Sequence, residues 1–409
     1  MSNIPKLRFK EFSKEWKEDR LKNVVKVSQG LQIAISDRFI TYTKNRVFYI
    51  TIPFIQGKKV EYIENPRKSI LCNDEDILVV RTGSGVGKII KGVNGAFHNN
   101  FFKIKDFPKL DNNFIYYFLI RPKTQFLMSK YAGTSAIPDL NHSDFYAIFL
   151  DFPSVPEQKK IATFLISVDT KIDQLNQKLK LLQSYKKGVM QKIFSQEIRF
   201  KADDGSDFEA WEEKRLSEMG STYNGLTNKD KNDFKSKQGY PYLQYKQIFD
   251  KASIDISNVG YVCITLDEVK RQRQNKVKYG DILFTTSSET PLEVGMSSVL
   301  LSPMKRLYLN SFCFGYRPNS LELLHPMFAK YLFRNRNFRK EIEKLAQGST
   351  RYNISKKEVM KIKVDLPNIM EQIKIANFLS SIDTKIEQTQ EQLKATKAFK
   401  KSLLQQMFI

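Results

Sequence analysis

The sequence contains few of the residues from which disulfide frameworks and metal centres are built. Its 409 residues include three cysteines and three histidines, all far apart: Cys72, Cys263, Cys313, His98, His142 and His325. An odd, scattered set of cysteines excludes a disulfide scaffold and a cysteine-based zinc site, and it favours a reducing compartment. No histidines show the paired spacing of metal ligands. We therefore expect neither a disulfide nor a metal site.

Long apolar segments are also missing. No run approaches the roughly 18 apolar residues of a membrane-spanning helix. The opening Met-Ser-Asn-Ile-Pro-Lys lacks the apolar core of a signal peptide. We expect a soluble, cytoplasmic chain that is not exported.

The sequence has no recognisable catalytic motif. It contains neither a Gly-x-Ser-x-Gly elbow nor the Asn-Pro-Pro-aromatic tetrapeptide of amino-group methyltransferases. Residues 81–88 are rich in glycine, but a phosphate-binding P-loop needs glycine where Thr82 stands and a hydroxyl where Ile89 stands. We interpret this stretch as a tight turn after a strand and predict that the chain is not an enzyme.

Positive charge is what the sequence has in excess. Its 67 lysines and arginines against 44 acidic residues give a formal charge of +23. This indicates a polyanionic partner, with nucleic acid favoured over an anionic membrane surface. Hydrophobic residues at 41% and aromatics at 12% supply enough core for about two or three folded domains.

The chain consists of two copies of one unit. Residues 151–194 and 365–408 align without a gap, 214 residues apart, and agree at about half of their positions. Upstream, Arg8-Phe9-Lys10 recurs as Arg199-Phe200-Lys201, and Trp16 recurs as Trp211. The offset changes between matched segments, so loops differ in length while the framework is kept. Each copy, near 1–194 and 198–409, is a variable globular part followed by a closely matched tail.

Each tail is predicted to be one long helix. Ser154-x-x-Glu157 and Asn368-x-x-Glu371 fit a capping box at its start. Apolar residues then recur at steps of three and four, which indicates helices that pair as an antiparallel coiled coil. The predicted pairing residues are Leu165, Val168, Ile172, Leu175, Leu179, Leu182, Leu379, Ile382, Ile386 and Leu393. The alternative is that each helix lies on the surface of its own globular part.

The globular parts are predicted to mix helices and strands. Runs of Ile, Val, Phe and Tyr at 47–50 and 77–80 lie between turn-forming residues and predict strands, whereas 111–130 and 324–346 predict helices. The polar stretch 195–210 predicts a linker. We expect an α+β fold in which two mixed α/β domains in tandem repeat are separated by two long antiparallel coiled-coil helices.

A second motif resembles the active-site pattern of metal-dependent nucleases. Pro138-Asp139 is followed by Glu157-Gln158-Lys159, as in sites where two carboxylates hold a metal and a lysine activates water. The second copy has Asn353 and Ile373 at the corresponding positions, and Glu157 is already assigned to a helix start. We therefore disfavour nuclease chemistry.

Taken together, these features resemble the specificity subunit of Type I restriction–modification systems. The resemblance rests on one signature that occurs twice: Pro153, Glu157, Gln158, Ile161, Ala162, Phe164, Leu165, Asp169, Thr170, Lys171 and Ile172, and again Pro367, Glu371, Gln372, Ile375, Ala376, Phe378, Leu379, Asp383, Thr384, Lys385 and Ile386.

The resemblance implies that each variable part is a target recognition domain for one half of a split, asymmetric site in double-stranded DNA. It implies that the helices set the spacing between half-sites and dock two methyltransferase subunits, which restriction/translocase subunits can join. The chain itself would bind no cofactor, because S-adenosylmethionine, ATP and Mg belong to those partners. On this basis 1–152 and 196–366 hold the recognition domains, the latter with the linker, and 153–195 and 367–409 hold the helices.

Candidate base-reading residues lie in loops at corresponding places in the two copies. Arginine and lysine suit guanine, asparagine and glutamine suit adenine, and serine and threonine suit either. The candidates are Arg81, Thr82, Ser84, Lys88, Thr134 and Ser135 in the first copy, and Thr286, Ser287, Ser288, Ser349, Thr350, Arg351 and Asn353 in the second.

Two other classes of function remain as alternatives. A non-specific adaptor would hold nucleic acid with an affinity set by salt and nearly independent of sequence. A single-chain nuclease or methyltransferase is disfavoured by the missing motifs. The divergence of the globular parts, against the sameness of the tails, favours a protein that reads sequence.

Overall fold

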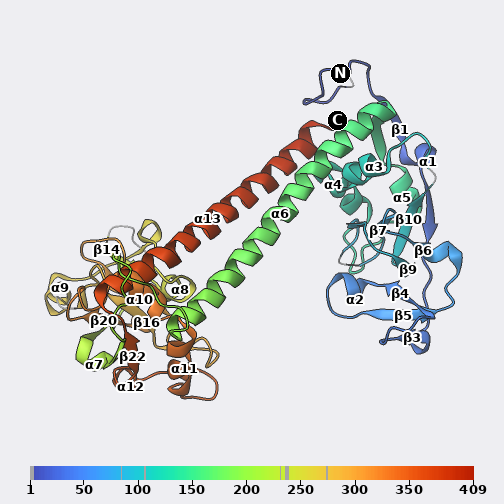
Figure 1. The fold of residues 1–409 in the computed structure, drawn as a ribbon. Coiled ribbons are helices and arrows are strands. Elements are labelled where there is room, and N and C mark those ends of the chain that lie inside the picture. The colour runs from blue at the N-terminus through green and yellow to red at the C-terminus, as the bar shows by residue number, and fades with distance from the viewer. Residues whose placement is uncertain (1–3, 84, 106, 231, 235–238, 273–274) are drawn as a thin grey trace. The chain divides into compact units, whose positions relative to one another are not determined.

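The fold is described from a computed structural model that covers residues 4–83, 85–105, 107–230, 232–234, 239–272 and 275–409. The chain forms two compact units (Figure 1). Unit 1 comprises residues 1–178 and 389–409, and unit 2 comprises residues 179–388. These units follow contacts in space, whereas the domain limits predicted above follow the sequence repeat.

Unit 1 combines short strands with a helical layer. Its elements before the first long helix are β1 (Lys17–Arg20), α1 (Leu21–Val24), β2 (Lys26–Gln29), β3 (Arg38–Phe39), β4 (Arg46–Ile50), α2 (Ile52–Ile55), β5 (Glu61–Glu64), β6 (Leu71–Cys72), β7 (Ile77–Val80), β8 (Ile89–Ile90), β9 (Gly95–Phe97), β10 (Phe101–Lys105), α3 (Asn112–Ile120), α4 (Pro122–Tyr131), α5 (His142–Tyr146) and β11 (Phe149–Phe152).

The strands of unit 1, in the described residues, form three sheets with the orders β1-β11, β2-β10-β7-β8 and β3-β5-β4-β9-β6. Pairing is antiparallel except between β4 and β9, where Tyr49 and Ile50 lie parallel to Ala96 and Phe97. The apolar run 77–80 forms β7 and is buried on both faces, because β7 lies inside its sheet between β10 and β8. The strand prediction for this run is confirmed.

Unit 2 repeats the same plan. Its elements between the long helices are β12 (Glu212–Arg215), α7 (Leu216–Met219), β13 (Gly220–Asn224), β14 (Tyr240–Leu243), α8 (Tyr245–Asp250), β15 (Gly260–Val262), α9 (Leu266–Arg271), β16 (Ile282–Thr285), β17 (Ser287–Ser288), β18 (Ser297–Val299), β19 (Tyr308–Leu309), β20 (Cys313–Pro318), α10 (Pro326–Leu332), α11 (Arg336–Lys344), β21 (Tyr352–Asn353), α12 (Lys356–Val359) and β22 (Lys363–Leu366).

The sheets of unit 2 match those of unit 1 in most of their strands. The order β13-β20-β16-β18 matches β2-β10-β7-β8, and β15-β14-β19 matches β5-β4-β9, including the parallel pair. The pair β12-β22 likewise matches β1-β11. Unit 2 adds β17-β21, in which Ser287 lies opposite Asn353. The two mixed α/β domains predicted from the repeat are confirmed.

The predicted helix at 111–130 is interrupted. It forms α3 and α4, which meet at Arg121 in an extended conformation (φ −64°, ψ 147°). Pro122 is the cause, since a proline disfavours helical backbone in the residue before it. In unit 2, the predicted helix at 324–346 is α10 and α11, and the Asn335 side chain caps the second of these by accepting from the Phe338 amide.

The two tails form the long helices α6 (Val155–Phe194) and α13 (Ile369–Gln406). Both units contain a segment of each helix, and within each unit the two segments run antiparallel. In unit 1, Asp169 of α6 pairs with Lys400 of α13, and in unit 2, Lys186 of α6 pairs with Asp383 of α13. The predicted antiparallel long helices are therefore present.

The core of each unit is completed by the end of the helix that belongs to the other copy. In unit 1, Leu403 and Leu404 from the last turn of α13 and Phe408, just after it, lie in one cluster with Trp16 and Phe114. Figure 1 shows that end of α13 beside α3 and α4. In unit 2, Ile193 and Phe194 from the end of α6 occupy the corresponding place among other buried residues. Each unit thus needs residues from both copies.

Candidate nucleic-acid interface

The first turn of each long helix is anchored by a buried glutamate. Glu157 Oε1 accepts from Arg8 Nε at 2.7 Å and from Trp16 Nε1 at 3.3 Å. Glu371 makes the same contacts with Arg199 at 2.8 Å and Trp211 at 3.0 Å.

These contacts correct the predicted capping box and explain why the upstream Arg-Phe-Lys and Trp recur. Neither glutamate reaches back to close a capping box, because its carboxylate is occupied by an arginine and a tryptophan. Asn368 does accept from the Glu371 amide at 3.0 Å, as a cap should. The upstream Arg-Phe-Lys and Trp recur in the sequence because they supply these partners.

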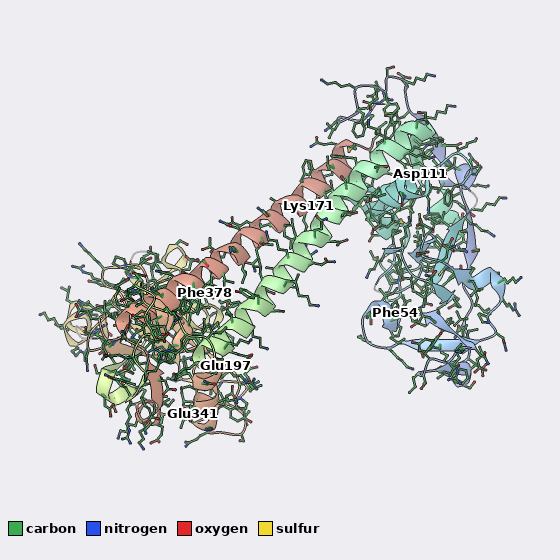
Figure 2. The ribbon with its side chains drawn as sticks, in the orientation of Figure 1. Phe54, Asp111, Lys171, Glu197, Glu341 and Phe378 are labelled. Atoms are coloured by element: carbon green, nitrogen blue, oxygen red, sulfur yellow. The ribbon has the colours of Figure 1, made fainter. Side chains whose placement is uncertain are left out.

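The glutamine that follows each glutamate joins the globular part to the helix. Gln158 Oε1 accepts from the Asp111 amide at 2.8 Å, and its Nε2 donates to the carbonyls of Pro153 and Lys109. Figure 2 shows Asp111 beside α6. Gln372 repeats this with the His325 amide at 2.9 Å. The Glu-Gln of the doubled signature is thus a structural joint.

The aspartate of the signature forms a reciprocal cluster in each unit. Asp169 accepts from Tyr117 Oη at 2.8 Å and pairs with Lys400. Asp383 accepts from Tyr331 Oη at 2.8 Å and pairs with both Lys186 and Lys330. Because each lysine of the Asp169–Lys400 and Asp383–Lys186 pairs comes from the other copy, these contacts bind the two helices to each other.

Burial and hydrogen bonding shift the pKa values in these clusters. Burial would raise the pKa of Asp383, but hydrogen bonds from Lys186 and Lys330 outweigh it and lower that pKa. Burial, followed by the hydrogen bond to Asp383, raises the pKa of Tyr331 far above its ordinary value. The aspartate is therefore charged and the tyrosine neutral at pH 7.

The predicted pairing residues fall into two groups. The first group lies in the unit cores: Leu165, Val168, Leu379 and Ile382 are buried, and Ile172 and Ile386 pack against the same clusters. The second group follows farther along the helices: Leu175 and Leu393 are buried, while Leu179 and Leu182 are half-buried. The start of each helix therefore lies on its own globular part, as the alternative stated. The ion pairs Asp169–Lys400 in unit 1 and Lys186–Asp383 in unit 2 join the two helices to each other.

The candidate base-reading loops of unit 1 come together in space. Thr82 forms an isolated bridge with Asp139, and the Gly83 amide donates to the Pro138 carbonyl at 3.0 Å. Thr134 and Ser135 are exposed on the neighbouring turn, and so is Lys88. Candidate Ser84 lies outside the described residues. The glycine-rich stretch is a turn after β7, as interpreted above, with Gly83 and Gly87 at positive φ.

The candidate loops of unit 2 meet in the same way through β17 and β21. Asn353 lies opposite Ser287 and is exposed, as are Ser349, Thr350 and Arg351. Ser287 and Ser288 are 8% exposed, so most of their surface faces protein. Thr286 is half-buried, and its hydroxyl donates to the Phe312 carbonyl at 2.8 Å.

The structure adds residues that sequence reasoning did not select. Asp139 holds Arg81 in a two-point ion pair, with Nε–Oδ1 at 2.8 Å and Nη2–Oδ2 at 3.0 Å. In unit 2, a hollow of about 340 Å³ beside β17 is lined by Tyr245, Phe249, Phe312, Glu293 and Arg351, among others. Asp139 could have been found from Pro138-Asp139, had that motif not been considered only as a nuclease site.

The two carboxylates of the nuclease-like motif serve separate arginines. Asp139 is engaged by Arg81, and Glu157 by Arg8. Across the residues that the structure describes, no group of three or more His, Cys, Asp or Glu side chains is arranged to hold a metal ion.

A basic surface lies within unit 2. A hollow of about 960 Å³ is bordered by Lys187, Arg336 and Lys340, with Met190 and Tyr331 also in its lining. An excess of cations around a hollow attracts anionic groups.

The helices in the described ranges include none that is long and apolar enough to cross a membrane.

Comparison with known proteins gives consistent matches over nearly the whole chain. The family described as Type I restriction modification DNA specificity domain matches twice, at residues 13–184 and 209–396. The type I restriction enzyme MjaVIII specificity subunit of Methanocaldococcus jannaschii is 24% identical over 404 residues, which is 95% of this chain and 91% of that protein.

Solved structures share the fold. The S subunit of a Type-I restriction-modification system from M. genitalium covers 99% of both chains at 16% identity, with a TM-score of 0.59. A chain from a type I R-M system, solved in work on complex assembly and conformational transition, covers 96% of this chain and 97% of its own at 17% identity, with a TM-score of 0.56.

The two family matches coincide with the two copies found in the sequence, and the anchored helices account for the signature that those copies share. The chain belongs to the type I restriction–modification DNA specificity family, whose members are the non-catalytic, DNA-recognising subunits of type I restriction–modification complexes.

Proposed function

We propose that unit 1 and unit 2 each read one half of a bipartite, asymmetric site in double-stranded DNA. The observation that supports this most directly is that the same sheet framework carries different side chains at the same loop positions. Arg81 and Asp139 in unit 1 correspond to Thr286 and Asn353 in unit 2. Equivalent loops with different donors and acceptors select different bases.

We further propose that α6 and α13 fix the spacing between half-sites and dock two methyltransferase subunits. The helices carry apolar side chains that the chain itself leaves uncovered, including Leu181 at 69% exposed, Tyr185 at 54% and Phe399 at 51%. Exposed apolar residues along paired helices are suited to packing against further helices.

The remaining partners follow from the family. Methyltransferase subunits would supply S-adenosylmethionine, and restriction/translocase subunits would use ATP and Mg. All of them would act on DNA in the cytoplasm. Phosphate contacts from the chain's net charge of +23 would add affinity without adding sequence information.

Methylation sequencing tests the proposal. DNA from cells that carry this chain with its methyltransferase is compared with DNA from cells in which this chain is deleted. We expect methylated adenines at one split motif to disappear on deletion. Exchange of the globular part of one copy for that of another family member should change one half of the motif and preserve the other half and the spacing.

Two results would contradict the proposal. Unchanged methylation, in a complex shown to be expressed and assembled, would remove the specificity role. Binding that depends on salt and not on sequence would support the non-specific adaptor instead.

A further inference from the structure

Arg81 has a backbone position fixed from both sides. It directly follows β7, its amide donates to the Asn100 carbonyl at 2.7 Å, and its carbonyl accepts from the Leu140 amide at 2.9 Å. Hydrogen bonds at both its amide and its carbonyl fix the backbone of Arg81 independently of the glycine-rich turn that follows it. The base of the side chain is therefore presented from the rigid sheet.

The side chain of Arg81 is fixed as well. Asp139 accepts from Nε at 2.8 Å and from Nη2 at 3.0 Å, so one edge of the guanidinium is occupied. Asp139 is itself fixed by the bridge to Thr82 and by its amide, which donates to the Ala132 carbonyl. The side chains are 32% and 40% exposed. An arginine has five N–H donors, so the edge formed by Nη1 and Nη2 can still donate to a ligand.

Pre-organisation of this kind is typical of a recognition residue. A free arginine loses side-chain entropy when it binds, whereas one already held by a carboxylate loses less. The ion pair alone would contribute little to stability, because both side chains are partly exposed to water. The arrangement therefore does more for the direction of the guanidinium than for the fold.

The corresponding place in unit 2 is built differently on the same framework. The Thr286 amide donates to the Phe312 carbonyl and the Thr286 carbonyl accepts from the Ile354 amide, as for Arg81. Asn353 occupies the position of Asp139, opposite Ser287. A fixed, donor-only cation in unit 1 is thus replaced by neutral Thr and Asn side chains, which both donate and accept.

We propose that Arg81 reads a guanine in the half-site of unit 1 and that Asp139 is the positioning residue that aims it. Guanine presents two acceptors, O6 and N7, to the major groove, and a donor-only fork matches both. Adenine places an amino donor beside N7, which a guanidinium cannot satisfy. Unit 2, with Thr286 and Asn353, makes no such selection at the equivalent position. This inference rests on the proposed function and adds the base that one residue reads.

The test uses the full chain with its methyltransferase, expressed in cells that also carry a plasmid library with every base at each motif position. Arg81→Gln removes both the charge and the donor-only fork. Asp139→Asn keeps the size and removes the two-point ion pair. For both variants we expect the preference for guanine at one position of one half-site to fall by about tenfold or more. The other half-site and the spacing should be unchanged.

The matched control is Arg46→Gln, which breaks another arginine–carboxylate pair of unit 1, with Glu64, outside the candidate loops. It should leave the motif unchanged. If wild-type methylation shows a split motif and both loop variants keep full guanine preference, the assignment is wrong. An even loss across the whole half-site, with a shallower salt dependence of binding, would show that Arg81 contacts phosphate instead. Absence of any wild-type motif would overturn the proposed function itself.

Discussion

Glu157 and Glu371 show how single residues give the repeat its signature. Each glutamate collects an arginine and a tryptophan from the start of its own copy, and it does so where the long helix leaves the globular part. A charged hydrogen bond in a buried site is shorter and stronger than a neutral one. The glutamates therefore act on the orientation of the helix relative to the globular part of the same unit.

Removal of one such glutamate should be costly. Glu371 is fully buried, so Glu371→Ala would leave the Arg199 guanidinium and the Trp211 N–H without their acceptor. We expect the free energy of unfolding to fall by about 2–4 kcal/mol, measured by urea denaturation. Glu341→Ala, which removes an exposed i,i+3 pair with Lys344, is the control and should cost less than about 0.5 kcal/mol. Equal effects of both would contradict the anchoring role.

Asp383 should make stability depend on pH in the acid range. Its pKa is lower in the folded chain than in the unfolded chain, so the stabilisation is present above the ordinary value of 3.8 and is lost as the pH falls below it. Asp383→Asn should cost about 1–2 kcal/mol at pH 7 and flatten this acid dependence. Denaturation curves between neutral pH and pH 3 measure both effects. A variant with an unchanged acid profile would show that the cluster is not the source.

At the scale of elements, the sequence predicted the long helices, but it did not predict which residues of the globular parts they pack against. Periodic apolar residues without an interrupting proline predict one helix per tail, and α6 and α13 bear this out. Local signals also predicted β7, but the break between α3 and α4 depends on Pro122, which a reading of aromatic spacing overlooked.

Periodicity in the sequence could not predict contacts between distant segments. Leu403 and Phe408 continue the pattern of a helix face, but nothing in their spacing says that they enter the core around Trp16. The recognition loops behave similarly: Thr82 and Asp139 lie in separate sequence segments, and only the fold of unit 1 brings them together.

The residues just after α13 should be essential to unit 1. Phe408 is 4% exposed and packs against Phe114, with ring centroids 5.1 Å apart, and against Trp16. Phe408→Ala should lower the free energy of unfolding of unit 1 by about 3 kcal/mol. Phe399→Ala, inside α13 but 51% exposed, should cost less than about 0.5 kcal/mol. Hydrogen exchange of β7 and β10 amides would locate the loss. A Phe399 effect as large as that of Phe408 would refute this assignment.

At the scale of the whole molecule, each of the reciprocal contacts that one copy makes with the other is matched by an equivalent contact made in return. Asp169 and Lys186 of the first copy correspond to Asp383 and Lys400 of the second, and Phe194 corresponds to Phe408. Each copy therefore supplies both members of the exchanged contacts.

A chain of residues 1–197 should accordingly form a homodimer in which each copy receives the other's Phe194. Sedimentation measurements would detect it, and Phe194→Ala with Lys186→Ala should shift the equilibrium toward monomer. A half-chain that stays monomeric and fully folded would show that unit 1 does not require a second copy of the helix.

Exchange of helix ends also sets the order in which the chain can finish folding during synthesis. The sheets of unit 1 are translated before unit 2, yet the core around Trp16 and Phe114 is closed by residues 403–408, which are translated after unit 2. Unit 2, confined to residues 179–388, contains all of its own helix segments by the time α13 is half made. Unit 1 therefore begins to form before unit 2 and is completed after it, and its aromatic core surface stays uncovered until residues 403–408 are made.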